Sequence, residues 1–442
     1  TTPASYDLEV TPNDEVRPGP FYAEPVRNKF TCGMAVSTMG AEASGNKVVT
    51  VKDIRDRTGV PVSSGGAWGA PDLHDPKWND SELGEVFGIA TDEEFNVYLT
   101  AAMIPTYALS FSISNNQAIV FNIEPTVGAI NEMCYASNTP TATGTNRIFN
   151  NNEGIGNIVS NDNGLLFLTN ISDATIVVIE DMGSASPGNV VQVYNVTSFG
   201  VNDFFPTEQV WGIGYNPAEE RIYFSSPQGT GANIYSIDAT GGVLSGPEVL
   251  EFSVGGPAIA DIAFTDSGTQ MLLAERGGAH NSRAYQYFGG ASTTWTGQQE
   301  VFVGAYGSGR NSAGGVDYAY SSFTGPEPTD SECETFIAAS GDALNYQFMN
   351  YIYGYALFPI TGNAAPNGWP FDAADYANVN SIFLDNDVNT DIPDKVYQGD
   401  VEVFDCACPS KDCAEENGLQ MLPASPVDPN GVGDCCFILD FR

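Results

Sequence analysis

Apolar residues in this chain alternate with polar residues or come in runs of three to five, and helical periodicity is nearly absent. The 47 glycines and 27 prolines punctuate these runs. Short apolar runs bounded by turn-forming residues are typical of strands. The sequence therefore predicts an all-β protein.

One unit recurs along the chain: a short strand, a polar turn, an apolar triplet and a further alternating strand. In its clearest copy, the strand 155–159 leads through the turn 161–164 to the triplet Leu166–Leu168 and then to the strand 175–179. Further copies begin at Val86, Trp211, Ala260 and Gly315, and a vaguer one combines residues 382–384 with 401–404.

These units recur about every 50 to 70 residues, which suits four-stranded sheets repeated around an axis better than two stacked sheets. We predict a β-propeller with six blades, closed by a strand from residues 48–51 or 59–62. Seven blades are the alternative if residues 30–70 form a blade of their own. We expect an N-terminal arm at residues 1–29, the propeller at 30–405 and a Cys-rich tail at 406–442.

Two motifs carry a family resemblance. Residues 88–92 (GIATD) with 96–100 (NVYLT) resemble blade openings of secreted bacterial propellers of the NHL-repeat and gluconolactonase-like kind, and residues 160–167 (SNDNGLLF) resemble the Asp-box turn of propellers. The resemblance covers about residues 80–405 as a pattern and implies an architecture. The Asp box implies a hairpin-stabilising turn and no catalytic role.

The chain is acidic, with 16 Lys and Arg against 55 Asp and Glu, for a formal net charge of −39. Nucleic-acid binding needs clustered basic residues, so this class of partner is excluded. We interpret the acidity as a solvated surface that prevents clumping. No apolar run is long enough for a transmembrane helix. Because the chain begins at Thr1 without a leader-like segment, we expect a mature, exported, extracellular protein.

An even number of cysteines, clustered towards the C-terminus, favours disulfides in an oxidising compartment. Paired C-x-x-C spacing and a nearby histidine, which a zinc site would favour, are both missing from the tail. The candidates for disulfide pairing, with connectivity left open, are Cys32, Cys134, Cys333, Cys406, Cys408, Cys413, Cys435 and Cys436.

The sequence lacks the parts of a hydrolytic triad, because its only histidines are His74 and His280 and no G-x-S-x-G turn occurs. Lactonase-like propellers hold a divalent cation at the channel mouth with carboxylates and amides. By position near the starts of inner strands, the channel-mouth candidates are Glu85, Glu153, Asn157, Glu208 and Asp261.

A second acidic string places oxygen-bearing side chains at alternate positions, as a hard cation requires. It lacks the Gly and Glu of a complete calcium loop, so a solvated turn competes with a structural Ca²⁺ site. The candidate ligands are Asp385, Asp387, Asn389 and Asp391.

Two function hypotheses follow. The leading one is a non-enzymatic extracellular building block that self-associates into a surface fibre or matrix by strand addition. Its alternative is a Ca²⁺-dependent, lactonase-like hydrolase or a carbohydrate-binding propeller that acts at the channel mouth. Three sequons, at Asn79, Asn170 and Asn195, leave glycan attachment open. The assembly residues of the first hypothesis are Tyr6, Leu8, Val10, Phe437, Leu439 and Phe441.

Overall fold

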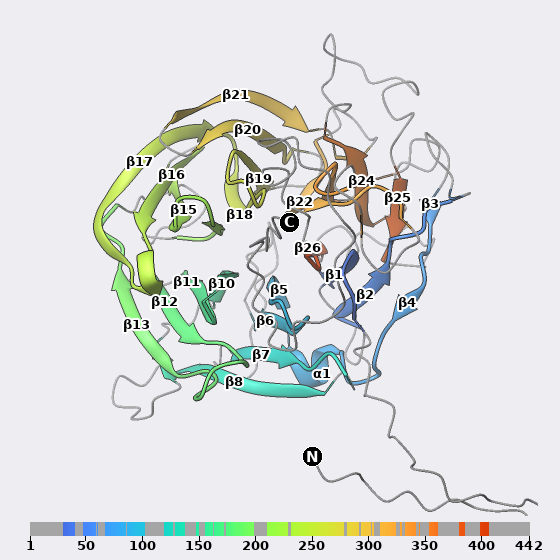
Figure 1. Ribbon diagram of the computed structural model, residues 1–442, viewed down its shortest axis with the longest axis horizontal. Helices are drawn as coiled ribbons and strands as arrows, with labels where there is room; N and C mark the ends of the chain where they lie inside the picture. The colour runs from blue at the N-terminus through green and yellow to red at the C-terminus, as the bar shows by residue number, and fades with distance from the viewer. Residues whose placement is uncertain are drawn as a thin grey trace, which may run out of the picture.

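A computed structural model shows six sheets arranged as blades around one axis (Figure 1), antiparallel except for the outer pairs β8–β9 (Ile130–Ser137 with Arg147–Phe149) and β25–β3 (Asn380–Phe383 with Ala67–Trp68). It describes residues 30–405 except 40–46, 102–118, 138–146, 199–209, 305–309, 345–352, 361–379, 385–397 and shorter stretches of one to six residues. The six-bladed all-β propeller predicted from the sequence is confirmed. The predicted arm and tail lie outside the described residues.

The first four blades follow the chain, each from its innermost strand outwards. Blade 1 contains β5 (Val86–Thr91), β6 (Val97–Ala101), β7 (Ile119–Ile123), β8 (Ile130–Ser137) and β9 (Arg147–Phe149). Blade 2 contains β10 (Ile155–Asn161), β11 (Leu165–Asn170), β12 (Thr175–Glu180) and β13 (Val190–Asn195). Blade 3 contains β14 (Ile213–Asn216), β15 (Arg221–Gln228), β16 (Gly231–Asp238) and β17 (Ser245–Gly255). Blade 4 contains β18 (Ala258–Phe264), β19 (Gln270–Arg276), β20 (Ala284–Gly290) and β21 (Thr293–Val301).

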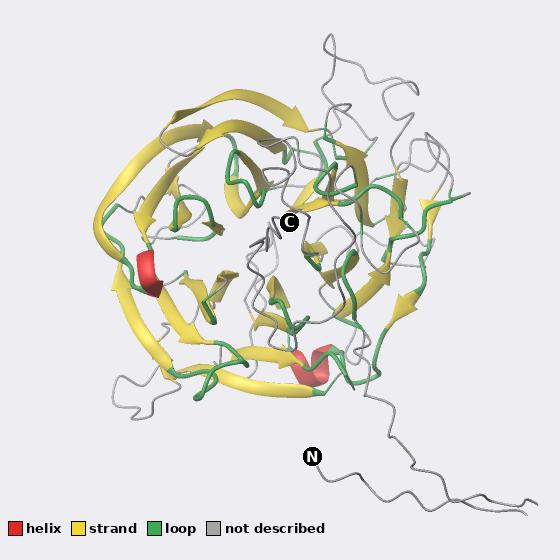
Figure 2. Ribbon diagram, in the orientation of Figure 1, coloured by secondary structure: helices red, strands yellow, loops and turns green. Residues whose placement is uncertain are grey.

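The last two blades combine both ends of the described chain. Blade 5 contains β22 (Ser312–Ala319), β23 (Phe336–Gly341), β24 (Gly354–Pro359), β25 (Asn380–Phe383) and β3 (Ala67–Trp68). Blade 6 contains β26 (Gln398–Val403), β1 (Met34–Met39), β2 (Val49–Asp53) and β4 (Asp72–Leu73). The described helices are short, α1 (Asp80–Leu83) and the 3-10 turn η1 (Thr240–Gly242) (Figure 2).

The ring closes where β26 pairs with β1, so a C-terminal strand completes a blade begun by N-terminal strands. Residues 48–51 contribute to this blade through β2, as predicted. One strand grouping made from the sequence was wrong. Residues 382–384 belong with β25 of blade 5 rather than with β26 of blade 6.

The apolar core lies between neighbouring blades. In the triplet of blade 2, Leu166 and Leu168 pack in the cluster shared with blade 1, whereas Phe167 packs in the cluster shared with blade 3. Successive side chains of a strand point to opposite faces, and here both faces are covered. A continuous apolar triplet is therefore what a strand between two blades requires.

Hydroxyl groups tie the inner strands of successive blades together. The Thr100 Oγ1 accepts a hydrogen bond from Gly88 N in its own blade at 3.0 Å and donates to Gly156 O of blade 2 at 2.7 Å. The same bridge occurs at Thr38, Thr169 and Ser225. Each hydroxyl pairs two backbone groups that would otherwise be buried without partners.

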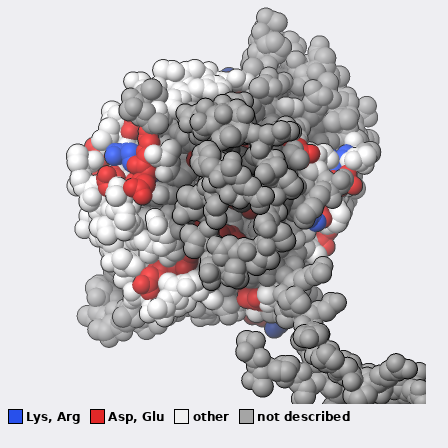
Figure 3. Space-filling model, viewed as in Figure 1, with Lys and Arg blue, Asp and Glu red and all other residues white. Residues whose placement is uncertain are grey.

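The described surface on one face carries scattered acidic groups and few basic ones (Figure 3). This agrees with the net charge of −39. Within the described residues, none of the helices is long and apolar enough to cross a membrane.

Candidate functional site

Six inner strands line the axis, and the residues at one level of these strands alternate between glycine and a polar side chain. Gly88, Gly212 and Gly315 stand in blades 1, 3 and 5. The polar side chains of blades 2, 4 and 6 are Asn157, Asp261 and Asp400. All three polar residues are buried.

The glycines make room for their neighbours. A Cβ added at Gly88 would lie 2.5 Å from Asn157 Oδ1, and one added at Gly315 would lie 2.6 Å from Asp400 Oδ1. Real Cβ atoms do not approach so closely. The Asn157 and Asp400 side chains therefore each lie over a glycine of the preceding blade, whereas a Cβ at Gly212 would meet the backbone N of Asp261 at 2.9 Å.

Backbone N–H groups hold the aspartates in place. Asp261 accepts from its own neighbour Ile262 N at 2.7 Å and from Val316 N of the next blade at 2.8 Å. Asp400 does the same, with Val401 N at 2.9 Å and Ile89 N at 3.1 Å. These carboxylates therefore link blades 4 to 5 and 6 to 1.

Asp317 of β22 makes the same kind of contacts, two residues after Gly315 on the same strand. It accepts hydrogen bonds from Tyr318 N and from Val403 N of blade 6, each at 2.7 Å. It also makes a side-chain hydrogen bond with Glu402 of β26. Strand alternation places Asp400 and Glu402 on one face of β26.

Asp261, Asp400 and Glu402 form a compact set of oxygen donors. Each offers one carboxylate oxygen, and these oxygens all lie within 4.8 Å of one another. The Asn157 Nδ2 donates to Asp261 Oδ1 at 2.7 Å and to Ala260 O at 3.2 Å. Because the amide directs its N–H group at the cluster, Asn157 positions Asp261 instead of adding an oxygen ligand.

Burial is the main cause that raises the pKa of Asp261, Asp317, Asp400 and Glu402 above the usual carboxyl range. The charge of Asp261 raises the pKa of Asp400 further, and those of Asp317 and Asp400 act on Glu402. Ionisation of all four would place like charges together in a buried site. The cluster therefore needs shared protons or a bound cation.

Aromatic side chains lie one residue earlier on the inner strands. Phe87 of β5 and Trp211, just before β14, meet edge to face with ring centroids 5.7 Å apart. The Arg276 guanidinium lies 5.2 Å from the Phe87 ring centroid and donates to Ala313 O. The carboxylate cluster is thus bordered along the axis by an aromatic and cationic layer.

The channel-mouth candidates named from the sequence have different outcomes. Asn157 and Asp261 meet at the axis. Three others, Glu85, Glu153 and Glu208, lie outside the described residues. The proposed calcium string of Asp385, Asp387, Asn389 and Asp391 lies outside them as well, so that site stays a prediction.

Sequence reasoning missed Asp317, Asp400 and Glu402. A signal was present in residues 400–403 (DVEV), where acidic and apolar residues alternate. An acid at every second position of an otherwise apolar strand indicates that one face of that strand meets something other than a blade.

Cys32 and Cys333 are each disulfide-bonded, and both contact the apolar cluster at blades 5 and 6. The five tail cysteines and the assembly residues Tyr6, Leu8, Val10, Phe437, Leu439 and Phe441 lie outside the described residues. The stapled tail therefore stays a prediction.

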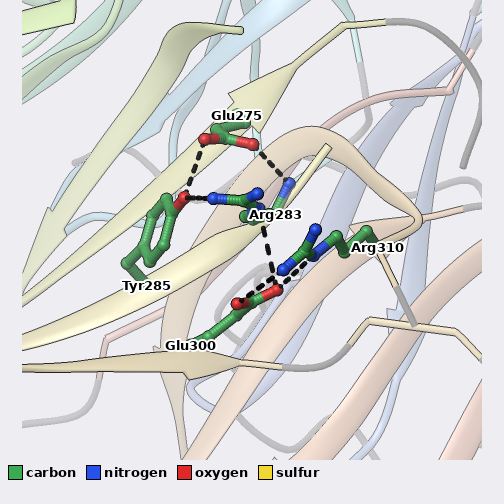
Figure 4. A network of polar contacts seen from close by, with 5 residues as sticks. All are labelled: Glu275, Arg283, Tyr285, Glu300 and Arg310. Carbon is green, nitrogen blue, oxygen red and sulfur yellow. Dashed lines mark hydrogen bonds and ion pairs between the residues drawn. The ribbon is translucent and has the colours of Figure 1, made fainter. Parts of the chain in front are cut away.

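A second buried carboxylate, Glu275, lies at the end of β19 in a polar network (Figure 4). It accepts from Tyr285 OH at 2.9 Å and from Arg283 N at 2.8 Å. The Arg283 Nη1 donates to Tyr285 OH, and Arg310 Nε donates to Glu300 Oε1 at 2.7 Å. Both Glu275 oxygens have protein donors, so we assign Glu275 a structural role.

No family model and no curated protein matches this sequence. Similar solved structures include a nidogen/laminin complex, at 12% identity and a TM-score of 0.44, covering 85% of this chain and 100% of the other. A periplasmic gluconolactonase from Pseudomonas aeruginosa matches at 10% identity and 0.42, covering 74% and 78%. TolB from Acinetobacter baumannii matches at 11% and 0.43, covering 79% and 65%.

At this level of identity, these likenesses concern the fold alone. They agree with the propeller architecture of lactonase-like type that the motifs predicted. The leading prediction, a non-enzymatic fibre subunit, is corrected in favour of its alternative, since the similar structures include a gluconolactonase and TolB.

Proposed function

We propose that this propeller binds a divalent cation of the Ca²⁺ type on its axial carboxylates and acts as a lactonase-like hydrolase at the channel mouth. The observation that carries this proposal is the convergence of Asp261, Asp400 and Glu402 oxygens within 4.8 Å. Carboxylate oxygens are the donors that Ca²⁺ and Mg²⁺ prefer.

Charge compensation supports a cation at this place. Burial disfavours the ionised form of each carboxylate, and their mutual repulsion adds to that effect. A bound divalent cation counteracts both the effect of burial and the repulsion between carboxylates, because it attracts the ionised forms. Backbone N–H groups already fix Asp261 and Asp400, so these two ligands need little reordering on binding.

The arrangement also suits hydrolysis. A cation in such a site polarises a carbonyl oxygen of a lactone. Asp317 lies beside the cluster, hydrogen-bonded to Glu402, and burial raises its pKa to about 7, so this carboxyl group accepts or donates a proton near neutral pH.

The cation half of the proposal is tested by calorimetric titration of CaCl₂ into EDTA-treated protein. We expect binding that weakens at least about tenfold in Asp400→Asn and in Glu402→Gln, since each removes a charged ligand. The exposed Glu93→Gln is the matched control, and circular dichroism checks that each variant keeps its β content. Absence of Ca²⁺ binding to the folded wild type would refute the cation site.

The hydrolase half is tested by turnover of δ- and γ-lactones, followed with a pH indicator against the spontaneous rate. We expect a Ca²⁺-dependent rate that EDTA abolishes and that Asp317→Asn lowers by about a hundredfold, as for loss of a general acid or base. If calcium binds but no lactone is turned over faster than in buffer, the hydrolase proposal fails and the cation site remains.

A further inference from the structure

A second concave site lies on the outer part of blades 3 and 4, away from the axis. It is a groove of about 590 Å³ between β15, β17 and β21, lined by Glu219, Arg221, Leu250, Glu251, Thr294 and Trp295. On the face shown in Figure 3, basic atoms enclosed by acidic ones lie over the left-hand blades, where β15–β17 are found in Figure 1.

The single arginine of this groove is held along one edge. The Arg221 Nε and Nη2 atoms donate to Ser236 Oγ at 3.0 and 2.8 Å. Ser236 Oγ in turn donates to Glu251 Oε1 at 2.5 Å. Within the described part of the chain, the Nη1 group of Arg221 makes no hydrogen bond, so its two N–H donors remain available beside Glu251.

The other carboxylate is fixed by two buried aromatic side chains. Tyr223 OH donates to Glu219 Oε2 at 2.6 Å, and it accepts from Trp295 Nε1 at 3.3 Å. Tyr223 and Trp295 are 1% and 7% exposed, so this chain of hydrogen bonds is anchored in the core. Tyr223 therefore fixes the position of Glu219, whose other carboxylate oxygen can accept from a ligand.

An apolar surface completes the groove. Leu250 is 53% exposed and lines the groove together with Trp295. Exposed apolar area next to oriented polar groups is the composition of small-ligand sites.

Charge and hydrogen-bonding capacity select the ligand class. An anion would gain Arg221 but meet two carboxylates, and a cation would gain the carboxylates but meet Arg221. A neutral ligand with adjacent hydroxyl groups both donates to the carboxylates and accepts from the guanidinium. We propose that this groove binds a neutral saccharide, with ring hydroxyls on Glu219, Arg221 and Glu251 and a C–H face on Leu250.

The proposal is tested by saturation-transfer NMR of the full chain with cellobiose, maltose and diacetylchitobiose as probes. We expect transfer to at least one probe, with affinity near about 1 mM for so open a groove. The variants Arg221→Met and Glu251→Gln should each weaken it about tenfold. Lys77→Met, an exposed charge removal on another blade, is the matched control.

EDTA separates this groove from the axial site, because no cation takes part in the proposed contacts. Saccharide binding that persists in EDTA and falls in Arg221→Met supports the proposal. It would be overturned by absence of transfer to all three probes, or by binding that Arg221→Met and Glu251→Gln leave unchanged.

Discussion

Glu275 offers a test of the electrostatics of this fold. Its side chain is fully buried at the end of β19, and burial raises its pKa to about 7. Its oxygens accept from Tyr285 OH and Arg283 N (Figure 4). In Glu275→Gln, the amide oxygen still accepts from Arg283 N, and the amide N–H donates to Tyr285 OH, which is also an acceptor.

The expected effect depends on pH, and its sign follows from the direction of the pKa shift. The pKa of this carboxyl rises from 4.5 in its reference state to about 7 in the folded protein. Below about pH 4.5 the carboxyl group is protonated in both states and costs no stability. As the pH rises through 7, the folded protein loses stability, because the group ionises more readily in the unfolded chain. The difference corresponds to about 3 kcal/mol at pH 8. The amide replaces charge-assisted hydrogen bonds with weaker ones, which costs about 1 kcal/mol. We therefore expect Glu275→Gln to be more stable than wild type by about 2 kcal/mol at pH 8.

Urea unfolding at pH 5 and at pH 8, followed by tryptophan fluorescence, measures the effect. We expect Glu275→Gln to gain stability over wild type between pH 5 and pH 8, with most of the change between pH 5 and 7. The exposed Glu93→Gln controls for removal of one carboxylate. A variant that loses the same stability at both pH values would show that the charge of Glu275 stabilises the network, and the reasoning would be wrong.

Three further outcomes are expected. Thr169→Val should lower the free energy of unfolding by about 2 to 3 kcal/mol in urea titrations, because it leaves Asn157 N and Trp211 O buried without their hydroxyl partner. Gly315→Ala places a Cβ 2.5 Å from Asp400 Cα and should abolish soluble, folded protein on size-exclusion chromatography, whereas Gly69→Ala, with open space around it, should be tolerated. Asn157→Asp adds a fourth carboxylate to Asp261, Asp400 and Glu402, at the place where an amide now bonds Asp261. Its melting temperature should fall in EDTA and recover with Ca²⁺, and a fall that Ca²⁺ does not reverse would argue against the axial cation.

The fold was accessible from the sequence because each blade repeats a local pattern. The triplet Leu166–Leu168 is apolar at every position, and this reflects packing against two neighbouring blades. The polar turn before it was also readable: Asn161 Oδ1 accepts from Asn163 N and Leu165 N, and Gly164 has a φ of +76°. Both signals act within about ten residues.

The errors arose where local pattern ends. Residues 380–383 and 398–403 lie close in sequence yet belong to different blades, because β26 pairs with β1 near the other end of the chain. Asn157 and Asp261 were singled out because they stand near the starts of inner strands. Their hydrogen bond joins residues 104 positions apart, so no local pattern contains it.

The axial cluster depends on the same long-range pairing as the ring itself. Asp400 and Glu402 both lie on β26, and Asp261 lies on the inner strand of blade 4. The three can meet only after β26 has joined β1 and the ring has closed. A ligand that binds only the folded state stabilises it in proportion to its affinity and concentration. Under the proposed function, calcium binding and ring closure are therefore linked, and removal of calcium would first weaken the β26–β1 pairing.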